Sequence, residues 1–254
     1  MRSSVMAGVG RLTRRVTLAV LVALLLAVPA GGQQPVSVAI WFLGFNVTQP
    51  PFDNVMARRA VAMALDRARI AAANDNNLAS SIEPPMCLGH NPAARLHPYN
   101  REQAKAVLEQ SGIKLDELSE LGVWHLSLLR RGNWQVELQI IVESLTALGL
   151  KGSLREFGTY NALERIATLA VVKMSYWGIR ADTRVCAQET FLEDMVHSRG
   201  VFNYFGYRNA EVDALIQRAI AASDRATKIR LYQEAEQKVL DDAVIVPIYW
   251  YLLR

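Results

Sequence analysis

Three side chains that could bind a small polar ligand lie within one short segment: Trp177, Arg180 and Asp182. A guanidinium can hold a carboxylate through two parallel hydrogen bonds, and a carboxylate can hold an ammonium group through charge-assisted hydrogen bonds. An indole adds an apolar wall with one N–H donor. These groups suit recognition of a ligand with charged ends. The alternative is that Arg180 and Asp182 are surface charges and Trp177 belongs to the core.

A second polar pair, Asn203 and Tyr204, precedes a helix that we expect to begin at Asn209. An amide and a phenol could both hydrogen-bond a ligand. The same residues could instead form a turn that holds the start of the helix, because Asn favours turns and helix N-caps. Both interpretations stay open.

The motifs that mark common catalytic sites are missing from the sequence, which has no Gly-x-Ser-x-Gly, no His-Glu-x-x-His and no phosphate loop. We therefore expect neither an enzyme nor a cofactor. Cys87, His90 and His97 lie near one another, but Cys-x-x-His with a distant His is not a recognised zinc spacing. No metal ligand is predicted, and an exported metal-binding protein is the least favoured alternative.

Composition indicates a globular chain that does not bind nucleic acid. Of 254 residues, 51% are hydrophobic and 20% are charged, which is enough apolar material for a core. The formal net charge of +4 equals the four arginines of residues 1–30, so the remainder is neutral. No basic stripe with interleaved aromatic residues is found.

Residues 1–30 have the layout of a secretory signal peptide. A basic start runs to Arg15, an apolar run spans Val16–Val28, and small residues follow. The apolar run is short for a transmembrane helix, which needs about 20 residues, although an uncleaved anchor is the alternative. We expect a periplasmic protein with one mature domain, residues 31–254. In such a protein Cys87 and Cys186 could form a disulfide or remain two buried thiols.

The elements that must position these residues alternate irregularly between strand and helix. Asn209 and Ser223 or Asp224 should cap two C-terminal helices with regular apolar faces. Pro247 splits the last apolar run, which predicts an edge or irregular strand. The mixture indicates an α/β lobe with a mixed sheet. The other expected elements are strands at 36–45, 151–157 and 169–177, helices at 54–73, 100–112, 136–148 and 160–168, and a loop at 74–98.

Four segments, taken in order, resemble one family. Phe42–Asn46 is followed by the turn Pro51–Asn54 and by Arg58–Arg67, where the family shows a strand ending in Asn, a Pro-Phe-Asp turn and an Arg-x-Ala-x-x-x-Ala-x-Asp helix. Pro98–Gly112 is close to the pattern Pro-Tyr-Asp, Ala-Lys, Ala-Gly. Ser175–Asp182 resembles the Trp-x-x-Arg-x-Asp-Pro form of the family's ligand loop. The fourth segment combines Phe202–Asn209 with Val212–Ile216, Asp224, Arg230–Tyr232, Ala235–Glu236 and Val246–Tyr249.

The family is that of the extracellular solute-binding proteins, family 5, which serve dipeptide, oligopeptide and nickel importers. The resemblance implies the C-terminal lobe of a type II periplasmic-binding-protein fold, acting in an ABC importer for peptides or similar small solutes. It implies ABC transporter permease subunits as partners. It places Asp182 where relatives receive the amino end of a peptide, beside Trp177 and Arg180.

The sequence also departs from the family. Relatives are longer and carry an N-terminal lobe before this region, which a separate chain could supply. The segment after Asp182 reads Thr183–Cys186 and lacks the usual Pro. The alternative function is therefore a non-binding remnant or an accessory interaction lobe.

Overall fold

The structure is a computed structural model that describes residues 37–115, 118, 120–126, 132–157, 172–182, 186 and 190–253. The expected signal peptide, residues 1–30, and the expected helix at 160–168 lie outside the described residues. Among the helices that are described, none is both long and apolar enough to cross a membrane.

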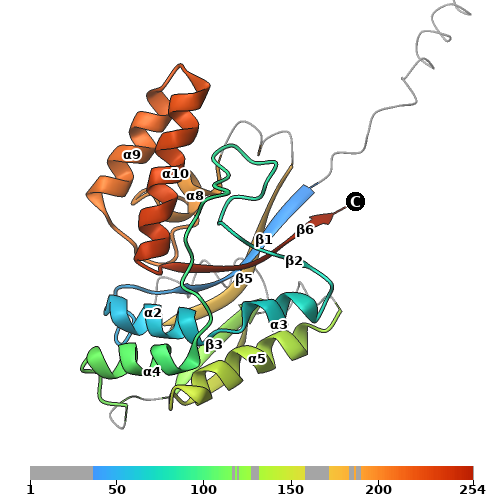
Figure 1. Cartoon of the computed structure of the whole chain (residues 1–254), viewed down its shortest axis with the longest axis vertical. Helices are drawn as coiled ribbons and strands as arrows, with labels where there is room; N and C mark the ends of the chain where they lie inside the picture. The colour runs from blue at the N-terminus through green and yellow to red at the C-terminus, as the bar shows by residue number, and fades with distance from the viewer. Residues whose placement is uncertain are drawn as a thin grey trace, which may run out of the picture. The chain divides into compact units, whose positions relative to one another are not determined.

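A mixed sheet of six strands forms the centre of the described body, in the order β2-β6-β1-β5-β3-β4 (Figure 1). Strand β1 lies antiparallel to both β5 and β6, whereas β3 lies parallel to β5 and β4. The mixed α/β prediction is confirmed. The strands are β1 (Ser37–Phe45), β2 (Asn77–Leu78), β3 (Leu121–Leu126), β4 (Gly152–Phe157), β5 (Met174–Asp182) and β6 (Ile245–Leu253).

Helices cover both faces of this sheet. One face packs against α8 (Phe191–Val196), α9 (Ala210–Ala221) and α10 (Arg225–Asp241) (Figure 1). The other face packs against α2 (Val55–Ala64), α3 (Arg67–Ala72), α4 (Arg101–Gln110) and α5 (Trp134–Ala147). A strand covered on both faces should be apolar at every position. The near-continuous apolar sequence of β1 meets this requirement, because alternate residues enter the two cores.

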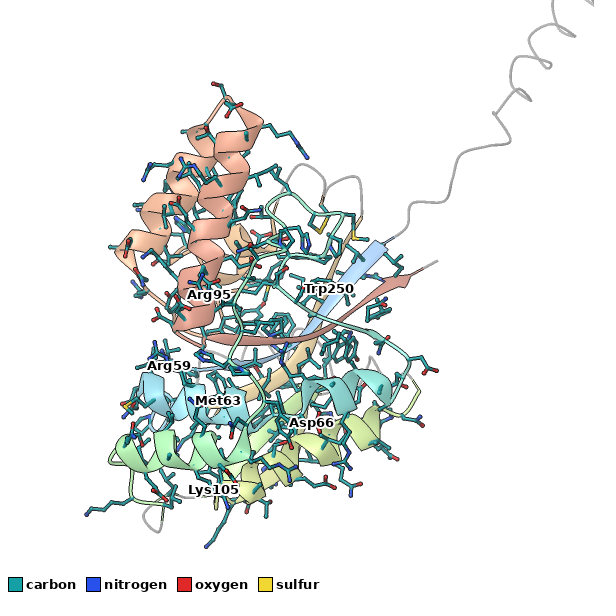
Figure 2. All side chains as sticks on the ribbon, viewed as in Figure 1. Arg59, Met63, Asp66, Arg95, Lys105 and Trp250 are labelled. Carbon is teal, nitrogen blue, oxygen red and sulfur yellow. A yellow bond between two sulfur atoms is a disulfide. The ribbon has the colours of Figure 1, made fainter. Side chains whose placement is uncertain are left out.

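The expected single helix at 54–73 is two helices. Leu65 is extended, and the Asp66 carboxylate accepts from the Arg69 N–H at 3.0 Å to cap α3. Figure 2 shows Asp66 at this junction. Asp competes for backbone N–H groups inside a helix and favours caps, so this residue ends one helix and begins another.

Strand β6 is irregular, as Pro247 predicts, but it is not an edge strand. It lies between β1 and β2, and its register with β1 shifts at Trp41/Phe42, opposite Tyr249 and Pro247. The short strand β2 pairs only with Tyr249 and Trp250. On that side no strand residue that the structure describes pairs with Pro247, whose carbonyl accepts from the Arg67 guanidinium at 3.0 Å. An interior strand can therefore tolerate its missing N–H.

The strand expected at 169–177 lies further along the chain, as β5. Met174 pairs with Phe45 and the pairing continues to Asp182, opposite Ser37. Because β5 pairs with the whole of β1, it continues past its apolar residues to Asp182. Arg180 and Asp182 consequently lie in a strand rather than in a loop. Strands β2 and β3 are absent from the elements expected from the sequence.

Candidate functional site

Strands β5 and β6 finish at the same end of the sheet, where β1 begins, and we call this end the carboxyl edge. Ser37 lies there between Asp182 of β5 and Leu253 of β6. Two residues further along β1, Ala39 lies between Arg180 and Tyr251. Strands β3 and β4 run parallel to β5, so their carboxyl ends point the same way. Ligands of open α/β sheets bind outside the carboxyl ends of parallel strands, which makes this edge the candidate site.

Strand alternation separates Trp177 from Arg180. Trp177 pairs with Phe42 and shares its face, whereas Arg180 pairs with Ala39 and has its Cβ on the opposite face. Trp177 is only 1% exposed and its ring lies 4.8 Å from that of Phe42 and 6.5 Å from that of Phe205. Its Nε1 has no hydrogen-bond partner among the described residues. The structure therefore places Trp177 in the core.

Arg180 is exposed and borders a hollow of about 90 Å³ at the end of β5. The hollow is lined mainly by apolar residues of the α8 side, namely Ile179, Ala181, Cys186, Phe191 and Phe202, with Thr190 and Asp194. Asp182 is the last residue of β5, and its side chain lies outside what the structure describes. Their ligand-binding roles stay predictions.

The side-chain amide of Asn203 hydrogen-bonds the backbone of the turn before α9. Its Nδ2 donates to the carbonyl oxygens of His197 and Tyr207, at 3.0 and 2.8 Å, and its Oδ1 accepts from the Tyr207 N–H at 3.2 Å. The half-buried Tyr204 has its ring 5.7 Å from that of Trp177. These hydrogen bonds favour the turn interpretation for Asn203, whereas Tyr204 packs against the core.

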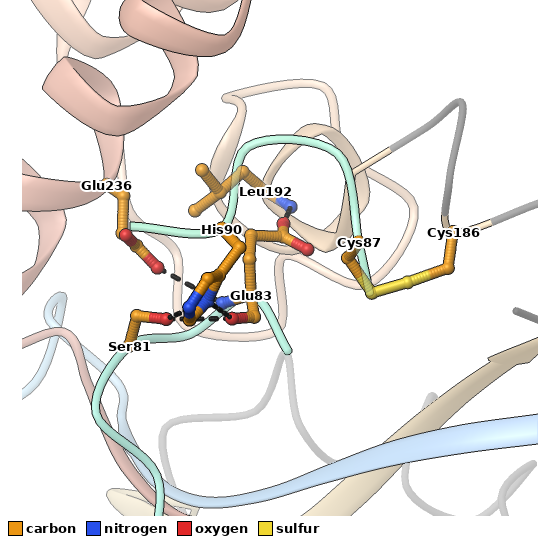
Figure 3. The surroundings of a disulfide bond; sticks show 7 residues. All are labelled: Ser81, Glu83, Cys87, His90, Cys186, Leu192 and Glu236. Atoms are coloured by element: carbon orange, nitrogen blue, oxygen red, sulfur yellow. Dashed lines mark hydrogen bonds between the residues drawn. A yellow bond between two sulfur atoms is a disulfide. The ribbon is translucent and has the colours of Figure 1, made fainter. Parts of the chain in front are cut away.

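A disulfide joins the loop after β2 to the segment after β5 (Figure 3). The Cα atoms of Cys87 and Cys186 lie 4.6 Å apart, and the Leu88 N–H donates to the Cys186 carbonyl at 2.7 Å. The two thiols left open by the sequence are thus paired. The bond ties the end of β5 to residues far away in sequence.

Two fully buried glutamates, Glu236 and the loop's own Glu83, hold the same loop in place (Figure 3). Glu236 Oε1 accepts from the N–H groups of Ile82 and Glu83 at 2.7 and 3.1 Å. Glu83 Oε1 accepts from the Leu192 N–H at 3.0 Å. Burial raises the pKa of Glu236 to about 7, and burial together with the Glu236 charge raises that of Glu83 well above its usual range. The pair anchors the loop to α8 and α10.

A larger pocket, which the sequence analysis missed, lies on the opposite face of the sheet. It has a volume of about 240 Å³. We call it the aromatic pocket. It is lined by Trp41, Trp134, Tyr249 and Tyr251 together with Asn74, Asn76, Gly132 and Glu137. The spacing of Tyr249 and Tyr251 puts both on one face of a strand, but this pattern alone does not distinguish a pocket from a core.

Glu137, in the first turn of α5, forms the polar floor of the aromatic pocket and is 2% exposed. Its Oε1 accepts from Asn74 Nδ2 at 2.5 Å. Its Oε2 accepts from the Tyr176 and Tyr249 hydroxyls at 2.6 and 3.3 Å. Burial raises the pKa of Glu137, while these three donors oppose the rise.

Gly178 allows the indole of Trp41 to form the wall of the aromatic pocket. The two residues pair across β1 and β5, and a Cβ on Gly178 would lie 2.8 Å from Cε2 and Nε1 of Trp41. The ring covers the glycine and lies 5.3 Å from the Tyr176 ring. The segment predicted to touch a ligand directly thus shapes the pocket through its glycine.

The described body, a mixed sheet covered on both faces, matches about half the length of solved type II periplasmic-binding-protein structures. HbpA2 from Haemophilus parasuis superimposes with a TM-score of 0.76 at 22% identity, over 86% of this chain and 45% of that one. A dipeptide-binding protein from Pseudoalteromonas sp. SM9913, in complex with Met-Leu, gives 0.73 at 19% identity, over 94% and 51%.

The chain belongs to the bacterial extracellular solute-binding proteins, family 5, whose middle-region model matches residues 21–186. Heme-binding protein A of Haemophilus influenzae is 25% identical over 216 residues, 82% of this chain and 38% of the relative. Glutathione-binding protein GsiB of Escherichia coli (strain K12) is 25% identical over 221 residues, 82% and 41%. The chain therefore spans less than half the length of these curated relatives.

Proposed function

We propose that this chain forms one side of the ligand cleft of a solute-binding protein in an ABC importer, and that the ligand is a peptide or a similar small solute. The observation that carries the proposal is the carboxyl edge. It gathers Arg180, the end of β5 at Asp182 and the aromatic pocket within a few strand positions of one another.

Peptides are favoured because their two ends match the charges at this edge. Arg180 can bind a carboxylate, and Asp182, where the family resemblance places the receptor of the amino end, can bind an ammonium. Neighbours in fold include proteins solved with Met-Leu and with a nonapeptide. The names of other relatives, which refer to heme and glutathione, keep the class of solute broad.

We also propose that residues 1–30 are a signal peptide and that the mature chain lies in the periplasm. The Cys87–Cys186 disulfide supports export, because disulfides persist in oxidising compartments. A second lobe, closing over the carboxyl edge, would complete the cleft and signal to permease subunits by domain closure.

A second candidate function is an accessory lobe that binds no solute itself. Two observations favour it: Trp177 is buried, and the amide of Asn203 is engaged with backbone. If this alternative holds, the chain should associate with another lobe or with the transporter without any peptide.

Titration of the purified chain by calorimetry, with Met-Leu and longer peptides, separates the two functions. Binding should also raise the melting temperature as ligand concentration increases. Arg180→Ala and Asp182→Ala should each weaken binding at least tenfold, whereas Arg218→Ala, on the exposed side of α9, should not. Absence of binding at millimolar peptide would reject autonomous binding, and unchanged affinity in both variants would reject this site.

A further inference from the structure

Among the residues that the structure describes, the carboxyl group of Glu137 in the aromatic pocket has no cationic side chain beside it. Glu137 is held by three neutral donors, from Asn74, Tyr176 and Tyr249. Among the described residues, no Lys or Arg side chain pairs with it. A buried carboxylate without a positive partner is costly in free energy, and a cation entering the pocket would reduce that cost.

The walls of the pocket suit the same kind of group. The rings of Trp41 and Tyr249 are stacked with centroids 6.1 Å apart, and Tyr251 lies 6.4 Å from Tyr249. Faces of aromatic rings attract ammonium and guanidinium groups, with indole the strongest. Asn74 and Asn76 add amides to the lining. Aromatic walls and an acidic floor together favour an organic cation over an anion or an alkyl chain.

The volume indicates what part of a ligand would enter. At about 240 Å³, the pocket is smaller than sites that enclose whole drug-sized ligands, roughly 300–1,000 Å³. It would therefore take a side chain or a head group. The pocket opens on the face of β1 and β5 that also carries Arg180, so a ligand held at the carboxyl edge could extend into it.

We propose that the aromatic pocket binds the ammonium or guanidinium head of an organic cation, with Glu137 as its counter-charge. The cation would belong to a basic residue of a peptide or to a free amine. The peptide source rests on the proposed function. This assigns the lobe a preference for positively charged solutes.

The test compares matched probes that differ only in charge. Calorimetry with Ala-Lys against Ala-norleucine, and with Ala-Arg against Ala-citrulline, should show at least tenfold tighter binding of the charged member. Agmatine, a guanidinium without a peptide backbone, tests the free-amine source. Glu137→Gln should remove the preference, whereas Glu109→Gln, on the exposed side of α4, should keep it.

The pattern of outcomes separates this inference from the proposed function. Equal affinity for charged and neutral peptides in the wild type overturns the cation pocket but leaves peptide binding standing. If agmatine binds and none of the peptides binds, the cation pocket is supported and the peptide proposal is overturned. A preference that survives in a folded Glu137→Gln variant overturns the role of Glu137. If that variant does not fold, the wild-type panel still decides, and failure of every probe overturns both proposals.

Discussion

Replacing the buried Glu236 with Gln should reduce the pH dependence of stability of this lobe. Burial raises the pKa of Glu236 in the folded state to about 7 from an ordinary value of 4.5. Between these two values the folded state therefore holds a proton that the unfolded chain has released. The contribution of Glu236 to the free energy of unfolding is fully present below about pH 4.5 and is lost as the pH rises through about 7.

The magnitude follows from the two pKa values. A pKa change from 4.5 to about 7 corresponds to about 3 kcal/mol in total, of which about 2.5 kcal/mol falls between about pH 5 and 8. Glu83 contributes in the same direction, because burial and the Glu236 charge raise its pKa as well. Glutamine keeps the oxygen that accepts from the N–H groups of Ile82 and Glu83 but cannot titrate.

The assay is urea unfolding of the wild type and Glu236→Gln at pH 5 and pH 8. We expect the free energy of unfolding of the wild type to fall by about 2.5 kcal/mol or more between pH 5 and pH 8. The fall in the variant should be smaller by about 2.5 kcal/mol. Glu234→Gln, an exposed position on the same helix, should keep the wild-type pH dependence. Glu236→Ala should lower stability at both pH values, because two buried N–H groups lose their acceptor. Equal pH dependence in the wild type and Glu236→Gln would refute the reasoning.

Three further substitutions test the fold. Exchanging Cys87 and Cys186 for Ser should lower the free energy of unfolding by about 2–5 kcal/mol, since the bond closes a loop with a sequence separation of 99; unfolding with and without dithiothreitol checks this, and identical curves would contradict it. Gly44→Ala should cost about 1–3 kcal/mol, because its Cβ would lie 2.1 Å from the Phe205 ring; an unchanged melting temperature would show that the ring moves freely. Asn209→Ala should cost about 1 kcal/mol by uncapping α9 and by removing the amide that donates to Tyr207 and Asp242; an unchanged melting temperature would contradict this.

The local pattern of the sequence determined much of the fold. Residue type predicted caps at Asn209 and at Ser223 or Asp224, and both Asn209 and Asp224 accept from N–H groups of the first helical turn. The apolar run of β1 predicted a buried strand, which the structure contains. Short-range hydrogen bonds and periodic apolar faces depend on neighbouring residues, so a single sequence is sufficient to indicate them.

Long-range pairing decided the rest. Nothing near β5 in sequence shows that β1 extends it to Asp182, or that its alternation sends Trp177 into the core and Arg180 to the opposite face. The aromatic pocket assembles from Trp41, Glu137 and Tyr249, which lie far apart in the chain. The Cys87–Cys186 bond likewise needed a fold that brings two distant segments together. The sequence therefore determined the family and the kinds of chemical group present, while only the tertiary structure determined which of those groups meet, because strand register and burial arise from contacts between distant segments.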